Sequence, residues 1–373
     1  MMQEIDIHAL AMALAKGMTA RLMLKWDGEG LSPRDFFSME ASDVAAALGI
    51  TSRHSLASVR REELPERAER ELTFIDRHNV RAYICTDRDY PYRLLQNYSA
   101  PPVLFTYGNG PLQSDHVVSV VGTRRPTAYG LKWCESIVEE CCRQCSDIQV
   151  VSGLAYGVDA CAHNAALAAG RETVAVVAHG LDMVYPAAHR QLAYDIASRG
   201  GLIVTQYPSK TQPFRNNFLA RNQIIASLAD ATIVVESGIR GGALSTANAA
   251  FDLDREVFAI PGRIGDEMSE GCNNLIRKNK ASVITGADTV VKAMGWHSAD
   301  SDTATPQQAQ LFPELSGEQM PVYNILKASD EPMSPDAIHI ASGMNIAAVM
   351  SVLGDMELDG ITVRLPGNRY SLA

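Results

Sequence analysis

The stretch "HVVSVVGTRRPTAYG", residues 116–130, decides the fold of this chain. Its first half is a short apolar run, and it ends at Gly122, where an arginine-containing turn leads into a helical pattern. The same order, an apolar run followed by a turn and a helical pattern, recurs along the chain. The further runs are "IQVVSG" (148–153), "TVAVVA" (173–178), "GLIVTQ" (201–206), "ATIVVES" (231–237) and "EVFAIPG" (256–262), with "ASVIT" (281–285) as a candidate seventh.

Runs that are apolar throughout are typical of strands buried on both faces of a parallel sheet. Helical patterns of matching length separate the runs, and this alternation indicates repeated βαβ units. The predicted fold class is therefore α/β, with a doubly wound, mostly parallel sheet in a central domain over residues 81–296.

The N-terminal flank, residues 1–80, is predicted to form a helical domain. In "SMEASDVAAALGI" a helix is expected to start with a cap at Ser38 or Ser42 and to stop at Gly49. The charged stretch "REELPERAERELTFIDRH" (61–78) reads as a helix with a solvated face.

The segments that border the central domain have patterns of their own. Residues 81–110, rich in Tyr and Pro, are expected to give a short strand and a docked irregular segment. The polar segment 297–316 is predicted to be a linker. Residues 317–373 show three helical patterns before a hairpin, which is a winged-helix-like arrangement, with Gly360 as the stop of the last helix.

Bulk charge limits the classes of partner. The 373 residues carry a formal net charge of -10, which argues against wholesale coating of nucleic acid or membrane but leaves room for a local basic groove. The sequence shows neither a secretory start nor an apolar run of membrane-spanning length. We therefore expect a cytoplasmic protein without a membrane partner.

Two groups of residues invite a metal-site interpretation. Cys134, Cys141, Cys142 and Cys145 have a spacing unlike common zinc patterns and share one helical face, so buried packing is favoured over a metal site. His179, Asp182 and His189 are interpreted as a structural loop. No metal is predicted.

Ligands of open parallel sheets bind beyond the carboxyl ends of the strands, so the residues there are the candidate site. They combine glycines, hydroxyls and arginines with few acids, which favours an extended phosphate-binding edge. Asp159 and Glu236, the acids there, are expected to accept hydrogen bonds from the backbone. The candidate residues are Gly122, Thr123, Arg124, Gly153, Lys210, Arg215, Phe218, Arg221, Asn222, Arg240, Gly241, Gly242, Ser245 and Thr246.

Nucleotide-cofactor and catalytic fingerprints are missing from this edge. Neither G-x-G-x-x-G nor the P-loop pattern occurs, so no cofactor is predicted. H-E-x-x-H and the G-x-S-x-G elbow are also missing, and no catalytic residue is predicted.

The stretch "PFRNNFLARNQIIASL" (213–228) lies within an acid-free run that extends from Ile196 to Ala229. If a helix starts at Asn217 or Phe218, Arg215, Phe218 and Asn222 can project over the strand ends. A cation, an aromatic ring and an amide together match single-strand nucleic-acid binding, in which charge follows the backbone and the ring stacks on a base. The alternative, that Phe218 is core and Asn222 caps a turn, stays open.

The same segments resemble those of the DNA-processing protein A (DprA/Smf) family. The similarity runs in order through "VVGTRRPTAYG", "VVSGLAYGVDACAHNAAL", "YPSKTQPFRNNFLARNQIIASLAD", "VVESGIRGGALSTANAA" and "GCNNLIRKNKA", over about half of the chain. The resemblance implies an extended Rossmann-like fold between a helical N-terminal domain (SAM or helix-hairpin-helix-like) and a winged-helix-like domain. It also implies single-stranded DNA binding, homodimers, loading of RecA recombinase in recombination and natural transformation, and no catalysis. The family's DNA-binding positions fall on Arg124, Arg215, Phe218 and Asn222, and Arg215 stands where many members have Lys.

Two alternative functions fit the sequence less well. Rossmann-like phosphoribohydrolases carry P-G-G-x-G-T-x-x-E, but Asn248 stands about where their Glu would be. A transcription factor would read bases with basic and amide side chains, but the predicted recognition helix (345–359) has acids and no Lys or Arg. The C-terminal unit is therefore interpreted as a protein-contact module.

Overall fold

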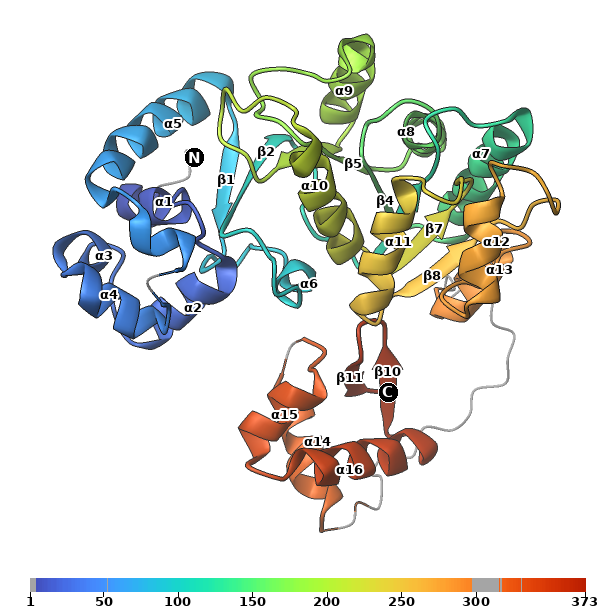
Figure 1. The fold of residues 1–373 in the computed structure, drawn as a ribbon. Helices are drawn as coiled ribbons and strands as arrows, with labels where there is room; N and C mark the ends of the chain where they lie inside the picture. Colours follow the sequence, from blue (N-terminus) through green and yellow to red (C-terminus); the bar gives the residue numbers. More distant parts are fainter. Residues whose placement is uncertain (1–4, 52, 297–314, 316, 330) are drawn as a thin grey trace.

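One nine-stranded sheet runs through the centre of the chain in this computed structural model, which describes residues 5–51, 53–296, 315, 317–329 and 331–373 (Figure 1). The strand order is β1-β2-β6-β5-β4-β3-β7-β8-β9. The strands are β1 (Arg81–Ile84), β2 (Val103–Gly108), β3 (His116–Val121), β4 (Ile148–Ser152), β5 (Thr173–Val176), β6 (Leu202–Thr205), β7 (Ala231–Val234), β8 (Glu256–Ala259) and β9 (Ser282–Val283).

The seven neighbouring strands β6, β5, β4, β3, β7, β8 and β9 are all parallel to one another. The antiparallel pairs are those of β1 with β2 and of β2 with β6. All seven predicted runs form strands of this sheet, and the doubly wound, mostly parallel fold class is confirmed. The segment 81–110 differs in part, because "VLFTYG" forms the strand β2 rather than an irregular stretch. Its backbone pairs with both β1 and β6. The local sequence, which is rich in Pro, does not indicate this pairing.

Helices cover both faces of the sheet, as the apolar runs require. On one face α7, α8 and α13 pack on the central strands, and on the other face α10, α11 and α12 do so. The helices of the central region are α6 (Tyr92–Leu95), α7 (Ala128–Gln144), α8 (Val158–Ala168), α9 (Arg190–Ser198), α10 (Arg215–Leu228), α11 (Ala243–Asp252), α12 (Glu270–Arg277) and α13 (Ala287–Met294).

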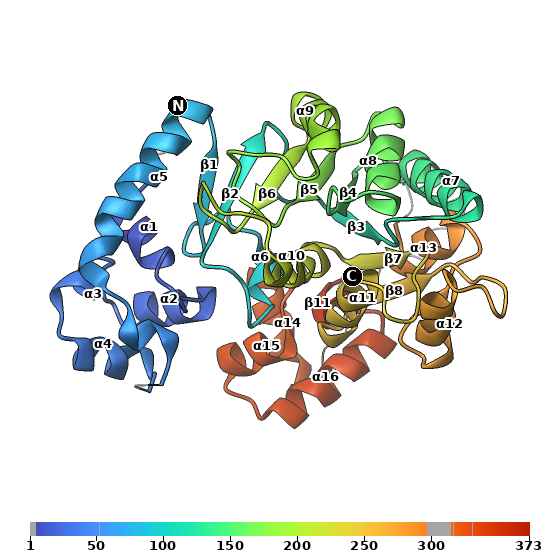
Figure 2. The same ribbon diagram turned by 45° about the horizontal axis from the view of Figure 1, so that its top comes forward.

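The predicted helical N-terminal flank is present beside the β1 edge (Figures 1 and 2). Its helices are α1 (Ile7–Ala13), α2 (Ala20–Gly28), α3 (Asp35–Ser38), α4 (Ala41–Leu48) and α5 (Leu64–His78). The helix stop at Gly49 is confirmed by its left-handed conformation, but the predicted cap is wrong. The residue before α4 is Glu40, which makes no side-chain cap bond, while Ser38 ends α3 and Ser42 lies inside α4.

The C-terminal unit has the predicted order of three helices and a hairpin. Its elements are α14 (Gln319–Ala328), α15 (Pro335–Ser342), α16 (Ile346–Leu358), β10 (Thr362–Leu365) and β11 (Arg369–Leu372). Gly360, in a left-handed conformation, follows the last residue of α16 by two positions, as expected of a stop. The predicted linker 297–316, apart from residue 315, lies outside the described residues.

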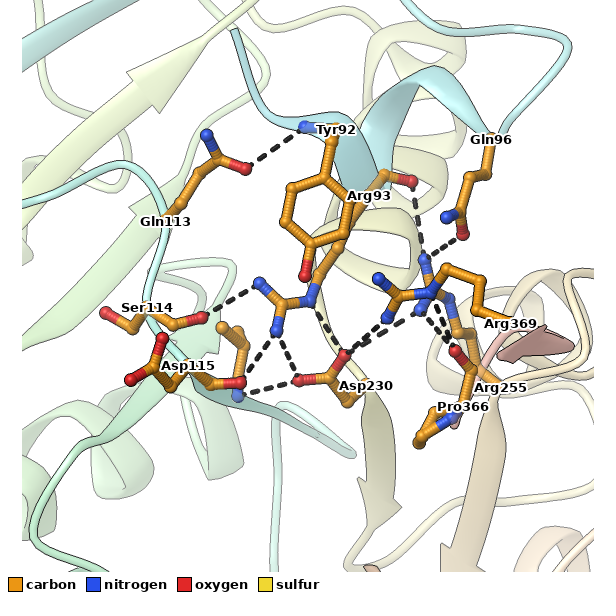
Figure 3. Close-up of polar contacts among 11 residues, drawn as sticks. Tyr92, Arg93, Gln96, Gln113, Ser114, Asp115, Asp230, Arg255, Pro366 and Arg369 are labelled. Carbon is orange, nitrogen blue, oxygen red and sulfur yellow. Dashed lines mark hydrogen bonds and ion pairs between the residues drawn. The ribbon is translucent and has the colours of Figure 1, made fainter. Parts of the chain in front are cut away.

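The hairpin turn docks at the amino ends of β7 and β8, where one buried carboxylate meets three guanidinium groups (Figure 3). Arg93 donates to Asp230 through Nε at 2.7 Å and Nη2 at 2.9 Å, while Arg255 and Arg369 approach it at 3.8 and 3.5 Å. Burial lowers the pKa of Arg255 to about 10, and Asp230 partly opposes this shift. Asp230 is therefore the shared counterion of an edge segment, the sheet and the hairpin.

The helices of the described residues bear on the question of a membrane span. No single helix there is both long and apolar enough to cross a bilayer, and only α15 and α16 taken together, as a pair bent by 115°, meet those criteria.

Candidate nucleic-acid interface

A cavity of about 960 Å³ opens at the carboxyl ends of β3 and β7. These two strands are neighbours in the sheet but far apart in sequence, and the chain leaves them in opposite directions across the sheet. Such a switch point is where open α/β sheets bind ligands. The residues around the cavity are Val121, Gly122, Thr123, Arg124, Ala155, Asp159, Arg215, Phe218, Leu219, Arg221, Asn222, Ser237, Gly238, Arg240, Gly241, Gly242, Ala243, Ser245, Thr246 and Met268.

The turn after β3 is held in place by its backbone. The amide of Thr123 donates to the carbonyl of Glu236 at 2.8 Å, and its carbonyl accepts from the amide of Val158 at 3.2 Å. Gly157, at φ 79°, packs against this turn so closely that a Cβ there would overlap the Thr123 carbonyl. The exposed Arg124 is thus presented from a fixed turn, at the mouth of the cavity.

Asp159 and Glu236 do accept backbone hydrogen bonds, as predicted. The carboxylate of Glu236 accepts from the amide and the hydroxyl of Thr127, at the start of α7. Asp159 Oδ2 accepts from the amide of Ala155 at 3.2 Å. Both carboxylates therefore have hydrogen-bond partners within the protein.

At the floor of the cavity, Arg221 is buried and its Nη1 lies 3.8 Å from Asp159 Oδ2. Burial raises the pKa of Asp159 and lowers the pKa of Arg221, and each shift is partly offset by the opposite charge of the partner. Gly153 leaves the space for this pair, because a Cβ on it would overlap the guanidinium. This geometry gives Arg221 and Gly153 a supporting position under the cavity.

Phe218 is half-buried and stands between cations at the cavity wall. The guanidinium carbons of Arg124 and Arg221 lie 5.5 and 5.8 Å from its ring centre, and the Tyr185 ring lies 6.0 Å away. The core alternative for Phe218 does not fit, because the side chain lines the cavity and is not among the buried residues.

Asn222 ties α10 to the start of α11. Its Nδ2 donates to Ser245 Oγ at 2.7 Å and lies 3.4 Å from the Gly242 carbonyl, so the turn-supporting role is present while the side chain still lines the cavity. The first residues of α8, α10 and α11 all border the cavity. Because helix N-termini carry partial positive charge, their arrangement favours an anion.

The charges around the cavity have one dominant sign. Four arginines line it, and Asp159 is the only carboxylate among the lining residues that the structure describes. The arginines are Arg124, Arg215, Arg221 and Arg240. With the ring of Phe218 beside them, the cavity can hold phosphate and stack a base.

The structure brings twelve of the fourteen predicted residues to this cavity. Gly153 lies beneath it, and Lys210 lines a different cavity beside α5. Sequence reasoning missed the lining residues Leu219, Ser237, Gly238 and Met268, and also Tyr185 beside Phe218. Leu219 and Ser237 lie within motifs already singled out, and Tyr185 lies in the loop between Asp182 and His189, whereas Met268 had no sequence signal.

The residues considered for a metal site have packing or hydrogen-bond contacts within the protein. The four clustered cysteines are buried, and burial raises the pKa of Cys145 to about 11. Cys145 lies near His116 and Asp147, and its Sγ donates to the Trp296 carbonyl at 3.4 Å. In the other group, His179 bonds the Gly180 carbonyl and His189 the Leu154 carbonyl, as a structural loop requires.

Comparison with known proteins gives a consistent picture. The family model of DNA recombination-mediator protein A matches residues 81–295, and the model of the DprA winged helix domain matches residues 303–368. Protein Smf of Synechocystis sp. is 34% identical over 318 residues, covering 76% of this chain and 78% of that protein.

Two solved structures are similar as well. The X-ray structure of DNA processing protein A (DprA) from Streptococcus pneumoniae has a TM-score of 0.64 at 31% identity and covers 78% of this chain and 98% of that one. A structure of DNA processing protein A from Helicobacter pylori, described for its single-stranded DNA binding mode, has a TM-score of 0.53 at 27% identity and covers 58% of this chain and 97% of that one.

Proposed function

This chain belongs to the DNA recombination-mediator protein A (DprA/Smf) family, and on that premise we propose that it binds single-stranded DNA at the carboxyl edge of its sheet. The observation that carries the proposal is the cavity at the β3–β7 switch point, in which four arginines and a half-buried ring face one engaged carboxylate. The Helicobacter pylori relative, described for single-stranded DNA binding, supports the same class of ligand.

Each group of residues has its own part in this binding. Arg124, Arg215 and Arg240 are exposed and contact phosphates. Phe218 stacks on a base. Arg221, paired with Asp159, acts as a positioning residue under the ring.

The glycines and hydroxyls let the DNA backbone come close. Gly122, Gly241 and Gly242 allow close approach, and Thr123, Ser245 and Thr246 offer hydroxyl groups at the cavity wall. Asn222 holds the α11 turn against α10.

The test is a titration of labelled oligonucleotides at several salt concentrations. Single strands should bind more tightly than duplex, and affinity should fall as salt rises. Arg124→Ala should weaken binding and lower the salt slope by about one unit. Phe218→Ala should cost about 1–3 kcal/mol of binding with little change of slope, because no charge is lost.

Two outcomes would refute the proposal. One is equal affinity for single strands and duplex, and the other is a Phe218→Ala protein that melts and binds like the unmodified chain. Arg125→Ala is a matched control for Arg124→Ala, since Arg125 is exposed in the same turn but does not line the cavity.

Membership of the family supports a wider role as part of this proposal. The protein acts without catalysis as a homodimer in the cytoplasm, and it loads RecA recombinase onto single strands during recombination and natural transformation. Light scattering that shows a monomer at micromolar concentration would remove the dimer. Release of free base from nucleoside monophosphates would instead support the phosphoribohydrolase alternative.

Domain boundaries at 1–80, 81–296 and 317–373, with a linker over 297–316, are part of the same proposal. The family models, which end at residue 295 and resume at residue 303, support the break before the winged-helix-like domain. Limited proteolysis should cleave first within the linker, and earlier cleavage inside 81–296 would contradict these boundaries.

A further inference from the structure

A second cavity, of about 600 Å³, separates helix α5 from two loops of the central domain. In Figures 1 and 2 the segment leading into α10 reaches toward α5, so the two walls come from parts of the chain far apart in sequence. The cavity is lined by Arg67, Arg70, Glu71, Thr73, Phe74, Arg77, His78, Asp182, Pro208, Ser209 and Lys210.

The helix wall of this cavity is a regular row of cations with one ring. Arg67, Arg70, Phe74 and Arg77 are spaced by three, four and three residues, which places them on one face of α5. The three arginines are exposed, and Phe74 is half-buried. His78 packs on Phe74 with ring centres 4.6 Å apart. The solvated helix predicted from the sequence therefore presents a basic face toward the central domain.

The two carboxylates of the cavity are already engaged by residues 209 and 210 of the central-domain wall. Glu71 is buried and accepts from the amide of Ser209 at 2.9 Å and from its hydroxyl at 2.7 Å. Asp182 accepts from the amide of Lys210 at 2.7 Å, which holds this residue at φ 65°. The bonds from Ser209 to Glu71 fix the spacing between the walls, and the bond to Asp182 positions Lys210. The cavity lining holds four cationic side chains against these two carboxylates.

The cations themselves are only weakly committed. Arg70 pairs with Glu66 at 2.8 Å, but both side chains are mostly exposed, and such pairs contribute little. Within the described residues, neither Arg77 nor the ammonium group of Lys210 forms an ion pair or a hydrogen bond. A polyanion can therefore pair with these cations without breaking strong contacts within the protein.

Contacts connect this cavity to the candidate nucleic-acid interface. Phe218 of the interface lies beside Tyr185, which is exposed and belongs to the loop that also holds Asp182. Asp182 in turn positions Lys210 at the second cavity. Aromatic and cationic groups thus follow one another from the first cavity to the second.

We propose that the cavity between α5 and Lys210 is a second contact site for the same DNA strand, which continues from the interface past Tyr185. This inference rests on the proposed function, because it needs a strand bound at the interface. Phosphates of the outgoing segment lie along Arg67, Arg70, Arg77 and Lys210, and Phe74 gives a base a face to stack on. The N-terminal helices then lengthen the binding site of the central domain.

The experiment compares oligothymidylates of two lengths, about six and about 25 nucleotides, by fluorescence anisotropy. In Arg70→Gln/Arg77→Gln, affinity for the long strand should fall by about tenfold and its salt slope by up to about two units. Affinity for the short strand should stay within about twofold, because the interface is untouched. Arg70→Lys/Arg77→Lys should restore most of the long-strand affinity, since phosphate contacts depend on charge.

The matched control is Arg60→Gln/Arg143→Gln, which removes two exposed arginines with ion-pair partners that do not line either cavity. Equal losses in the control and in Arg70→Gln/Arg77→Gln would overturn the inference, and so would equal losses for both strand lengths. If the unmodified protein binds neither strand, the proposed function itself fails. If the unmodified protein binds both strands and Arg70→Gln/Arg77→Gln binds the long strand just as tightly, only the second site fails.

Discussion

Replacing Gly153 with Ala should destabilise the protein by disrupting the ion pair between Arg221 and Asp159 at the floor of the cavity. The added Cβ would overlap Nη1 of Arg221 and lie 2.7 Å from Oδ2 of Asp159. Arg221 has little room to move, because it is buried and Phe218 lies above it. Overpacking costs about 1–3 kcal/mol, and a buried carboxylate that loses its partner costs about 3–5 kcal/mol. We expect a loss of about 3–5 kcal/mol in the free energy of unfolding, measured by denaturant titration.

Two further variants separate this cause from a general effect of the substitution. Gly28→Ala adds a Cβ at the last residue of α2, where it meets no heavy atom within 4 Å, so it should not lower the free energy of unfolding, since Ala is favoured over Gly in a helix. In an Arg221→Gln background the overlap with the guanidinium is gone and Asp159 is already unpaired, so only the approach to Asp159 Oδ2 remains and Gly153→Ala should cost about 1–2 kcal/mol. Equal costs of Gly153→Ala in both backgrounds would refute the reasoning.

The remaining predictions concern two other buried groups. Burial, with smaller effects of nearby positive charges, lowers the pKa of His163 to about 3, so the folded state favours the neutral ring. Above the unfolded pKa of about 6.5 the ring is neutral in both states and costs no stability. As pH drops from there toward 3, the free energy of unfolding falls by about 1.4 kcal/mol per pH unit, because the unfolded state takes up one more proton. His163→Gln should remove this one-proton contribution from the pH dependence of unfolding, as measured by denaturant titrations at several pH values. Arg369→Ala should expose the hairpin 362–372 to hydrogen exchange while the sheet keeps its stability, because Asp230 retains Arg93 and Arg255. Asp230→Asn should instead lower the free energy of unfolding by about 3–5 kcal/mol, because it leaves all three guanidinium groups without their counterion. Equal destabilisation by both changes would contradict a shared counterion.

The sheet could be predicted because its strands are short apolar runs between helical patterns. The strand β2 could not, because only its pairing with β1 and β6 defines it. The cap of α4 shows a similar limit. Ser38 and Ser42 are good capping residues, but α3 already uses Ser38, and tertiary context outweighs local preference.

The candidate site was predictable where a motif follows a strand and less so where burial decides. Arg221 and Arg215 have similar sequence surroundings, yet Arg221 is buried because Asp159, 62 positions earlier, pairs with it. Lys210 has neighbours from α5, more than 130 residues away, which no local pattern could indicate. The assignment of each cation therefore depends on contacts between distant segments.

The shared carboxylate at the amino edge also orders events during synthesis. Asp230 follows Arg93 by 137 residues and is followed by Arg255 soon afterwards, whereas Arg369 is made 139 residues after Asp230. The bidentate bond from Arg93 and the approach of Arg255 can form while the hairpin is still inside the ribosome. A nascent chain can thus complete its sheet with this carboxylate already paired, and the winged-helix-like unit docks afterwards on a central domain that has already folded.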